Sequence, residues 1–441
     1  MASKRHAEVR VGRRTLNRKA AAGILRDTVV SVFLIFALLG AKLWFEGTTI
    51  GSALESLGFA ELQRRLIPAG LTPQPTVALI DISGIQREKW TRDGKSGECT
   101  PRNKLLSVLA ALTTTRPRVI AVDIDFSPFE DGPVHPDDPV FFTTIMELAK
   151  KSGVPIFLGV DRQRFAGQEK WMGQAEFSNL AAAIAIPEAP DSRYYLRWIR
   201  GTGQSEALPS MSLVLARREA ESEHVDHGPL HHYVQASQLR GGSDSTGRSG
   251  EMSWALNNYS ALSGLKLEQI AATEPETILE NAARFANRSV VVGDVQNFQG
   301  HDHFDIGLIH PEDLPGVFLH ACGAATAQSP PLLELTHRGR VALDLIIAAV
   351  LVGLITVIRS CVALRSGSDV ADSDRLFRRL VAWAIVLCVV FAAGFIQTTH
   401  VMWTDFVCVV LALVAHLVFH HPAGNLLGYF IPFLGHKPHL P

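Results

Sequence analysis

Four short apolar runs that each stop at an aspartate constrain the fold of this chain more than any other feature. They are VALID, ending at Asp81; VIAVD, ending at Asp123; IFLGVD, ending at Asp161; and VVVGD, ending at Asp294. Continuous apolar runs of this length are typical of parallel strands that are covered on both faces. Helical patterns lie between the runs, so the sequence predicts an α/β domain.

The same pattern places several carboxylates at one edge of the predicted sheet. Parallel strands end at a common edge, and open α/β sheets bind ligands there. Asp125 adds a further acid just beyond Asp123. Two interpretations remain open. The acids gather to bind a cation or an amine, or each one caps a following helix or accepts hydrogen bonds from nearby turn amides.

Longer apolar runs predict four transmembrane helices, since each has about the 17 to 25 residues needed to cross a bilayer. The mean hydropathy is +0.15 although 19% of the 441 residues are charged. The basic leader and the arginines of one loop are expected to face the cytoplasm, together with both termini. No A-x-A site follows the first run, so we expect a signal anchor and not a cleaved signal peptide. The expected segments are the leader, 1–27; spans, 28–45, 341–358, 380–396 and 401–419; the extracytoplasmic domain, 46–340; the cytoplasmic loop, 359–379; and the cytoplasmic tail, 420–441.

Three ionisable residues lie within the expected spans: Asp344, Asp405 and His416. Such residues are costly inside a membrane and often functional. Asp344 and Asp405 lie near the outer ends of their spans, so we expect them to reach lipid headgroups. His416 is deeper and is expected to face another helix.

The segment GHDHF predicts a metal site only weakly. It offers His301, Asp302 and His303 as ligands, with Asp294 close in sequence. It is similar to the last motif of metallophosphoesterases, which makes a membrane-tethered, metal-dependent hydrolase one alternative function. The other motifs of that family are missing, as are a P-loop and a nucleophile elbow. We therefore expect no catalytic residue, no cofactor and no enzymatic activity.

Two of the five cysteines, Cys99 and Cys322, lie in the expected extracytoplasmic block. One possibility is a disulfide between them in an oxidising compartment. The other is that Cys99 is a surface thiol and Cys322 a small buried residue. We favour the two free thiols. The histidines of 224–250 lie in a polar, glycine-rich stretch that we interpret as a mobile insertion and not as a zinc site.

An ordered series of motifs resembles bacterial receptors that carry the CHASE domain of the second type, a sensory extracellular domain associated with cyclases and histidine kinases. An anchor precedes the α/β block and three helices follow it, as in those receptors. The motifs are IDIS at 80–83, PR at 101–102, VIAVDIDFSP at 119–128, PSMSL at 209–213, NNY at 257–259, VVVGD at 290–294 and LPGVFLHA at 314–321. The loop 94–100 departs from the family, in which a tryptophan and a proline often precede the helix arginine.

The resemblance implies a sensor in the bacterial inner membrane that binds an unknown small molecule or protein outside the cell. Receptors of this kind often continue into a cytoplasmic cyclase or kinase. We expect this chain to lack such an output domain and to act through a separately encoded cytoplasmic signalling protein. We also expect a homodimer, as is usual for receptors. A net charge of −1 gives no indication of a nucleic-acid partner. An envelope scaffold protein is the other alternative. The candidate ligand-binding residues are Asp81, Arg102, Asp123, Asp125, Asp161, Asp294 and Asp302.

Overall fold

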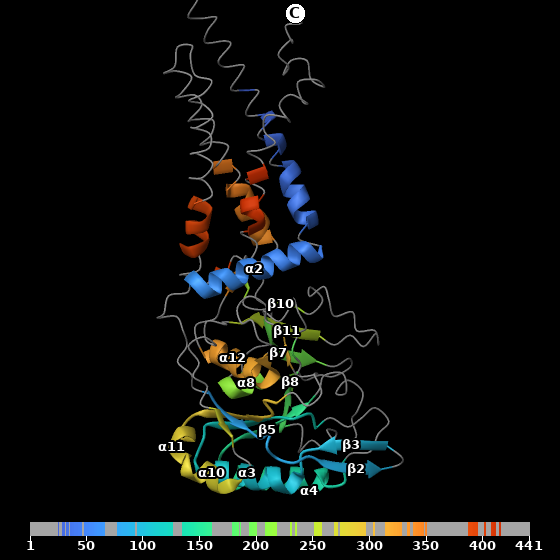
Figure 1. The fold of residues 1–441 in the computed structure, drawn as a ribbon. Helices are drawn as coiled ribbons and strands as arrows, with labels where there is room; N and C mark the ends of the chain where they lie inside the picture. Colours follow the sequence, from blue (N-terminus) through green and yellow to red (C-terminus); the bar gives the residue numbers. More distant parts are fainter. Residues whose placement is uncertain are drawn as a thin grey trace, which may run out of the picture. The chain divides into compact units, whose positions relative to one another are not determined.

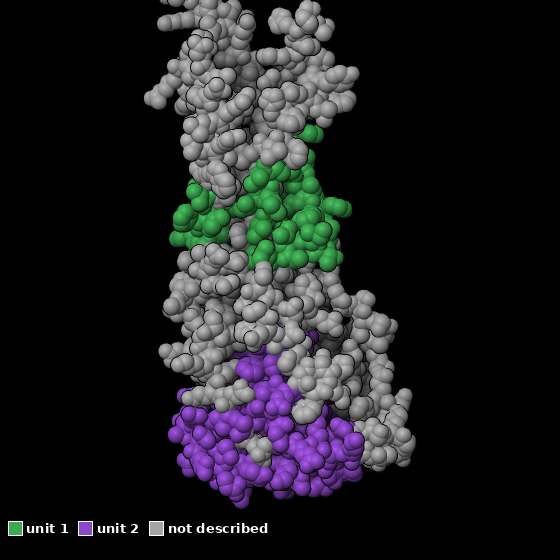
Figure 2. Space-filling view, viewed as in Figure 1, with its two compact units in different colours: residues 1–59, 335–396, 403–441 green, residues 60–334, 397–402 purple. Residues whose placement is uncertain are grey.

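The computed structural model forms two compact units, coloured separately in Figure 2. Unit 1 comprises residues 1–59, 335–396 and 403–441, and unit 2 comprises residues 60–334 and 397–402. The structure describes residues 25, 29–30, 32–34, 36–45, 48–66, 77–92, 95–126, 135–160, 179–184, 186, 194–200, 208–217, 230–231, 234–235, 251–257, 269–271, 274–296, 303–304, 314–328, 333–335, 338–347, 349–350, 387–395, 401–402, 407–411 and 414–415.

A six-stranded parallel sheet forms the centre of unit 2. Its order is β12-β1-β13-β4-β5-β6, so β13, the last of these strands in the sequence, lies between β1 and β4. The four apolar runs form β1, β4, β5 and β13, which confirms the predicted α/β class. The strands are β1 (Val77–Asp81), β4 (Val119–Asp123), β5 (Ile156–Val160), β6 (Ala181–Ala183), β12 (Gln269–Ala271) and β13 (Ser289–Gly293).

Helices cover both faces of this sheet (Figure 1). One face carries α3 (Arg102–Thr114), α4 (Asp138–Ser152), α10 (Pro275–Glu280) and α11 (Ala282–Phe285); the other carries α8 (Met211–Ala216) and α12 (Gly316–Gln328). The core between the sheet and the second helix pair includes Leu79, Ala121, Val291, Val214 and Val317. Each fully buried aliphatic side chain of this kind contributes about 1.5 to 3 kcal/mol.

An antiparallel sheet packs on the far side of α8 and α12. Its order is β10-β11-β7-β8, formed by β7 (Tyr194–Arg200), β8 (Leu208–Pro209), β10 (Val234–Gln235) and β11 (Glu251–Leu256). The sequence of residues 194–199 is compatible with a strand that faces solvent, but the structure places this strand in the core. All of these residues are buried, and Tyr195 and Trp198 form a cluster with Leu213 of α8.

Residues 88–92 and 95–99 form a β-hairpin, although their polar sequence is typical of a loop. Strands β2 (Glu88–Arg92) and β3 (Lys95–Cys99) pair antiparallel from Glu88 and Cys99 to Arg92 and Lys95. The sequence between them is Asp-Gly, a strong signal for a two-residue hairpin turn. Polar strands in a two-stranded ribbon lack the apolar alternation that reveals a strand, so the prediction missed them.

Short strands complete unit 2. β14 (His303–Phe304) pairs antiparallel with β15 (Leu314–Pro315) just before α12. A three-stranded sheet combines β9 (Leu230–His231), β16 (Leu333–Leu335) and β17 (Val401–Met402). Most of the expected insertion 224–250 lies outside the described residues, apart from β9 and β10.

Unit 1 contains helical segments from both ends of the sequence, and α2 (Thr49–Leu66) begins there. Within the described part of the chain no single helix has the length and apolarity to cross a membrane, although the pair Val32–Phe45 and Thr49–Phe59, bent by 92°, passes on length and composition together. Asp344, which we expected at the lipid headgroups, is instead buried and paired with Lys42.

Candidate functional site

The register of the parallel sheet brings three of the predicted strand ends together at its carboxyl edge. Asp81 of β1 lies opposite Gly293 of β13, and Gly293 lies opposite Asp123 of β4. Asp294 directly follows Gly293. The prediction that these strands carry acids to one edge is therefore confirmed for β1, β4 and β13. Asp161, which we expected at the same edge, and Asp302, a further candidate ligand-binding residue, lie outside the described residues.

Gly293 lets helix α12 approach this edge closely. A Cβ atom at position 293 would lie 2.8 Å from Val317 Cγ2 and 3.3 Å from Asp123 Cβ. The first distance is shorter than real carbon contacts allow, so any larger residue here would force the strand end or Val317 to shift. This packing covers Asp123 with α12.

Asp123 is a buried carboxyl that lies near the histidine His320. Its Oδ1 atom lies 3.7 Å from Nε2 of His320 on α12, and the two side chains are only 8% and 5% exposed. Burial raises the pKa of Asp123 from 3.8 to about 7, because a charged carboxylate is poorly solvated there. Burial therefore favours the protonated form of the carboxyl at this strand end.

Asp81 and Asp294 have local partners. Asp81 Oδ1 accepts a hydrogen bond from the Ser83 amide at 2.9 Å, and Asp294 Oδ1 accepts one from the Gln296 amide at 2.8 Å. Asp294 also accepts a hydrogen bond from Arg87 Nη2 at 2.7 Å, in a partly exposed ion pair. These contacts fit the interpretation in which each acid accepts hydrogen bonds from nearby turn amides. Asp125 is partly exposed beyond the end of β4.

Arg102 opens α3 as expected and is held inside the protein. Its Nε atom donates to Asp138 Oδ1 at 2.6 Å, with side-chain exposures of 7% and 5%. Its guanidinium carbon lies 4.6 Å from the ring centre of Phe126 and 5.8 Å from that of Phe141. Burial raises the pKa of Asp138, and the charge of Arg102 and its hydrogen bond oppose this shift. The pair joins the first turns of α3 and α4.

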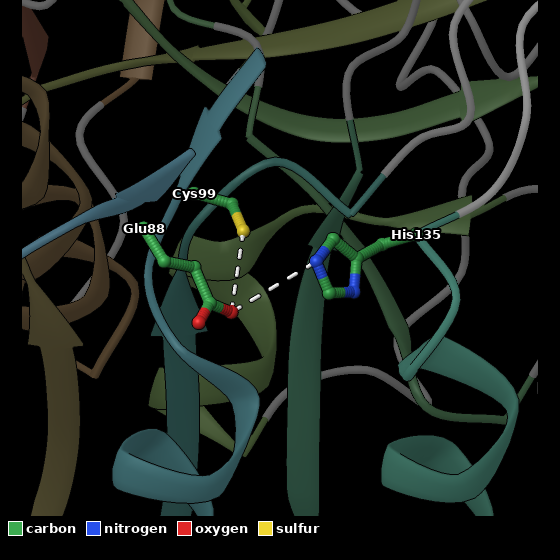
Figure 3. Close-up of side chains that lie close together, drawn as sticks. All are labelled: Glu88, Cys99 and His135. Atoms are coloured by element: carbon green, nitrogen blue, oxygen red, sulfur yellow. Dashed lines mark hydrogen bonds and ion pairs between the residues drawn. The ribbon is translucent and has the colours of Figure 1, made fainter. Parts of the chain in front are cut away.

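Next to this ion pair, Glu88, Cys99 and His135 point towards one another (Figure 3). Glu88 begins β2, Cys99 ends β3, and His135 precedes α4. Cys99 Sγ and His135 Nε2 each lie 3.9 Å from Glu88 Oε1. Burial raises the pKa of the Cys99 thiol to about 11; Arg102 opposes the shift, whereas Glu88 increases it. Cys99 is half-buried and not the surface thiol that we expected.

Cys99 and Cys322 are both free, and Cys322 is buried in α12 as predicted. The structure therefore has no disulfide between Cys99 and Cys322.

The predicted histidine cluster is described only in part. His303 lies opposite Pro315 in the β14–β15 pair, whereas His301 lies outside the described residues. The predicted intramembrane residues Asp405 and His416 also lie outside them.

Sequence reasoning missed the buried partners His320, His135 and Asp138. His320 is a single polar residue in the apolar run LPGVFLHA, which was a usable signal. His135 and Asp138 lie in the segment HPDDP, whose composition is that of a loop.

A central parallel sheet with helices on both faces, and polar side chains gathered at its carboxyl edge, defines an α/β domain. The chain belongs to the CHASE2 family, because the model of the CHASE2 domain matches residues 30–355. CHASE2 domains are extracellular sensory domains, which is consistent with a sensor role. No curated protein and no solved structure matches the chain.

Proposed function

We propose that this chain is a membrane-bound sensor whose CHASE2 domain detects an extracytoplasmic signal and relays it across the bacterial inner membrane to a separately encoded output protein. The observation that carries this proposal is the family match over residues 30–355. That range includes parts of unit 1 that precede and follow unit 2 in the sequence. The chain therefore enters and leaves the sensory unit through the helical segments of unit 1.

Two ion pairs in unit 1 support a relay. Lys42 pairs with Asp344 while both are buried, and Arg340 Nη1 lies 3.5 Å from Glu55 Oε1 of α2. Each pair joins a segment before unit 2 to a segment after it. Breaking the buried Lys42–Asp344 pair costs about 3 to 5 kcal/mol, whereas the partly exposed Arg340–Glu55 pair contributes less. Such pairs hold the two segments in one register, so a displacement of one segment is passed to the other.

The carboxyl edge of the parallel sheet is the face that we assign to signal binding. Asp294 and Arg87 present opposite charges there with side chains 22% and 35% exposed, which suits a polar small molecule or a protein surface. Asp123 lies beneath α12 and senses that surface indirectly. We assign binding and not catalysis to this face, because the family is sensory and the exposed groups at the edge are already paired.

Reporter fusions test the membrane topology. We expect fusions after Leu66, Gly242 and Thr398 to report the outside of the cell, and fusions after Ser366 and Pro441 to report the cytoplasm. This follows from the basic leader and the basic loop 359–379. A cytoplasmic signal at Gly242 would overturn the sensor proposal.

Affinity purification with in-cell crosslinking tests the relay. We assign the contact for the output protein to residues 424–441, which carry a dense group of large apolar side chains, and exposed apolar groups often mark interaction sites. Removing 424–441 should abolish capture of the partner while membrane insertion and thermal stability remain normal. As a matched variant, replacing Arg375, Arg378 and Arg379 by glutamine should leave capture intact. Capture of only envelope proteins from outside the cell would favour the scaffold alternative.

A further inference from the structure

We propose that Glu88, Cys99 and His135 together bind one divalent ion of the zinc class, with water or an added ligand in a fourth position (Figure 3). The three residues come from three separate segments, the start of β2, the end of β3 and the turn before α4. Metal binding at this place does not depend on the sensor function proposed above.

The spacing of the three ligand atoms fits a small ion. Zinc lies about 2.0 to 2.3 Å from its nitrogen, oxygen and sulfur ligands, so two ligands of a tetrahedral site are about 3.3 to 3.8 Å apart. Here the distances from Glu88 Oε1 to Cys99 Sγ and to His135 Nε2 are 3.9 Å, and all three atoms lie within 4.8 Å of one another. These distances are too long for strong hydrogen bonds. A small rotation of the partly exposed Glu88 closes the site.

The chemistry of the donors selects the metal. A thiolate and an imidazole favour zinc or another late transition metal over magnesium and calcium, which prefer oxygen ligands alone. A divalent ion also balances the local charge. The Glu88 carboxylate and a Cys99 thiolate carry two negative charges, whereas the neighbouring Arg102 and Asp138 already neutralise each other.

His135 is oriented with Nε2 towards Glu88. Its Nδ1 atom accepts a hydrogen bond from the Asp137 amide at 3.2 Å. Coordination through Nε2 places the ring proton on Nδ1, so this amide loses its acceptor. The bond is long and Asp137 is exposed, so water replaces the lost acceptor.

Solvent reaches the cluster at Glu88, whose side chain is 43% exposed, whereas the His135 side chain is only 6% exposed. Three protein ligands leave a position for water or for a ligand from solution, as in zinc sites that exchange their fourth ligand. The bound ion ties the β2–β3 hairpin to the start of α4.

Cobalt titration of the full-length chain in detergent, after treatment with a chelator, tests the proposal. We expect one equivalent of Co²⁺ to give the visible bands of a tetrahedral site and a near-ultraviolet charge-transfer band from a thiolate. Cys99→Ser should abolish the charge-transfer band. Loss of a residue that hydrogen-bonds to a metal ligand typically lowers metal affinity roughly 10- to 100-fold. Cys99→Ser removes a ligand itself, so it should lower the affinity for zinc by more than this. Glu88→Gln, which keeps the shape of the side chain, should weaken it in the same way.

Cys322→Ala is the matched control, because this thiol is buried in α12 and is not part of the cluster. It should leave the cobalt spectrum unchanged. A second measurement needs no variant: Zn²⁺ should slow alkylation of Cys99 in the wild-type chain, and Mg²⁺ should not. A thiolate band that survives in Cys99→Ser, equal zinc affinity of wild type and Cys99→Ser, or an alkylation rate unaffected by Zn²⁺ would each overturn the proposal.

Discussion

The buried pair of Arg102 and Asp138 allows a quantitative prediction. Arg102→Met keeps most of the stem and removes the charge, leaving a carboxylate that is 5% exposed without its cation. Loss of one partner of a buried pair costs about 3 to 5 kcal/mol, and that figure includes the cation–π contact with Phe126 at 4.6 Å. At about 2 to 4 °C per kcal/mol for a domain of this size, the melting temperature should fall on the order of 10 °C.

The assay is a thermal melt of the purified full-length chain, compared with Asp138→Asn in the Arg102→Met background. The double variant should be more stable than Arg102→Met alone, because no charge is then buried without a partner. The pH dependence has a definite sign. Burial raises the pKa of Asp138 in the folded chain, so this chain holds a proton more tightly than the unfolded one. Removing Arg102 takes away the charge and the hydrogen bond that lower this pKa, so Asp138 holds its proton to a higher pH in Arg102→Met than in the wild type. The deficit of Arg102→Met should therefore shrink at low pH and grow as pH rises. A melting temperature within about 2 °C of wild type, at the shift per kcal/mol used above, would refute the reasoning.

Three further changes test the carboxyl edge and unit 1. Gly293→Ala should destabilise the fold by about 1 to 3 kcal/mol, because the new Cβ atom would lie 2.8 Å from Val317 Cγ2. Adding Val317→Ala to this variant should restore part of the lost stability in a thermal melt. The pKa of Asp123 is about 7 in the folded chain and 3.8 in the unfolded chain, so the stability of the wild type should fall as pH rises from 3.8 to 7. Asp123→Asn should flatten this fall in stability. An unchanged slope would contradict the raised pKa of Asp123. Replacing Lys42 or Asp344 alone by leucine should lower stability more than replacing both, and additive losses would argue against a coupled pair.

Much of the central sheet was predictable because each of its main strands carries a local sequence signal. An apolar run that ends at an aspartate predicted β1, β4, β5 and β13, and helical spacing predicted α3 and α4. These signals need only neighbouring residues. The order of the strands was not predictable, because the position of β13 between β1 and β4 depends on pairing between distant segments.

The partners of the charged residues were harder to predict than the residues themselves. Arg102 and Asp123 were recognised as candidates, but Asp138 and His320, which pair with them, lie far away in the sequence. No periodic pattern links such pairs. The burial of β7 was missed because its arginines suggest a solvent-facing strand, whereas α8 and α12 lie against it.

The position of β13 also affects how this protein is made. Strands β1 and β4 leave the ribosome long before β13, yet neither can form its central ladder until residues 289–293 arrive. Contacts between distant segments form slowly, since a long loop must close first. Until then, the unfinished sheet would expose two unpaired edges rich in valine and isoleucine, which are prone to aggregate. A chaperone that covers these edges would therefore raise the yield of folded protein more than it would for a sheet that assembles in sequence order.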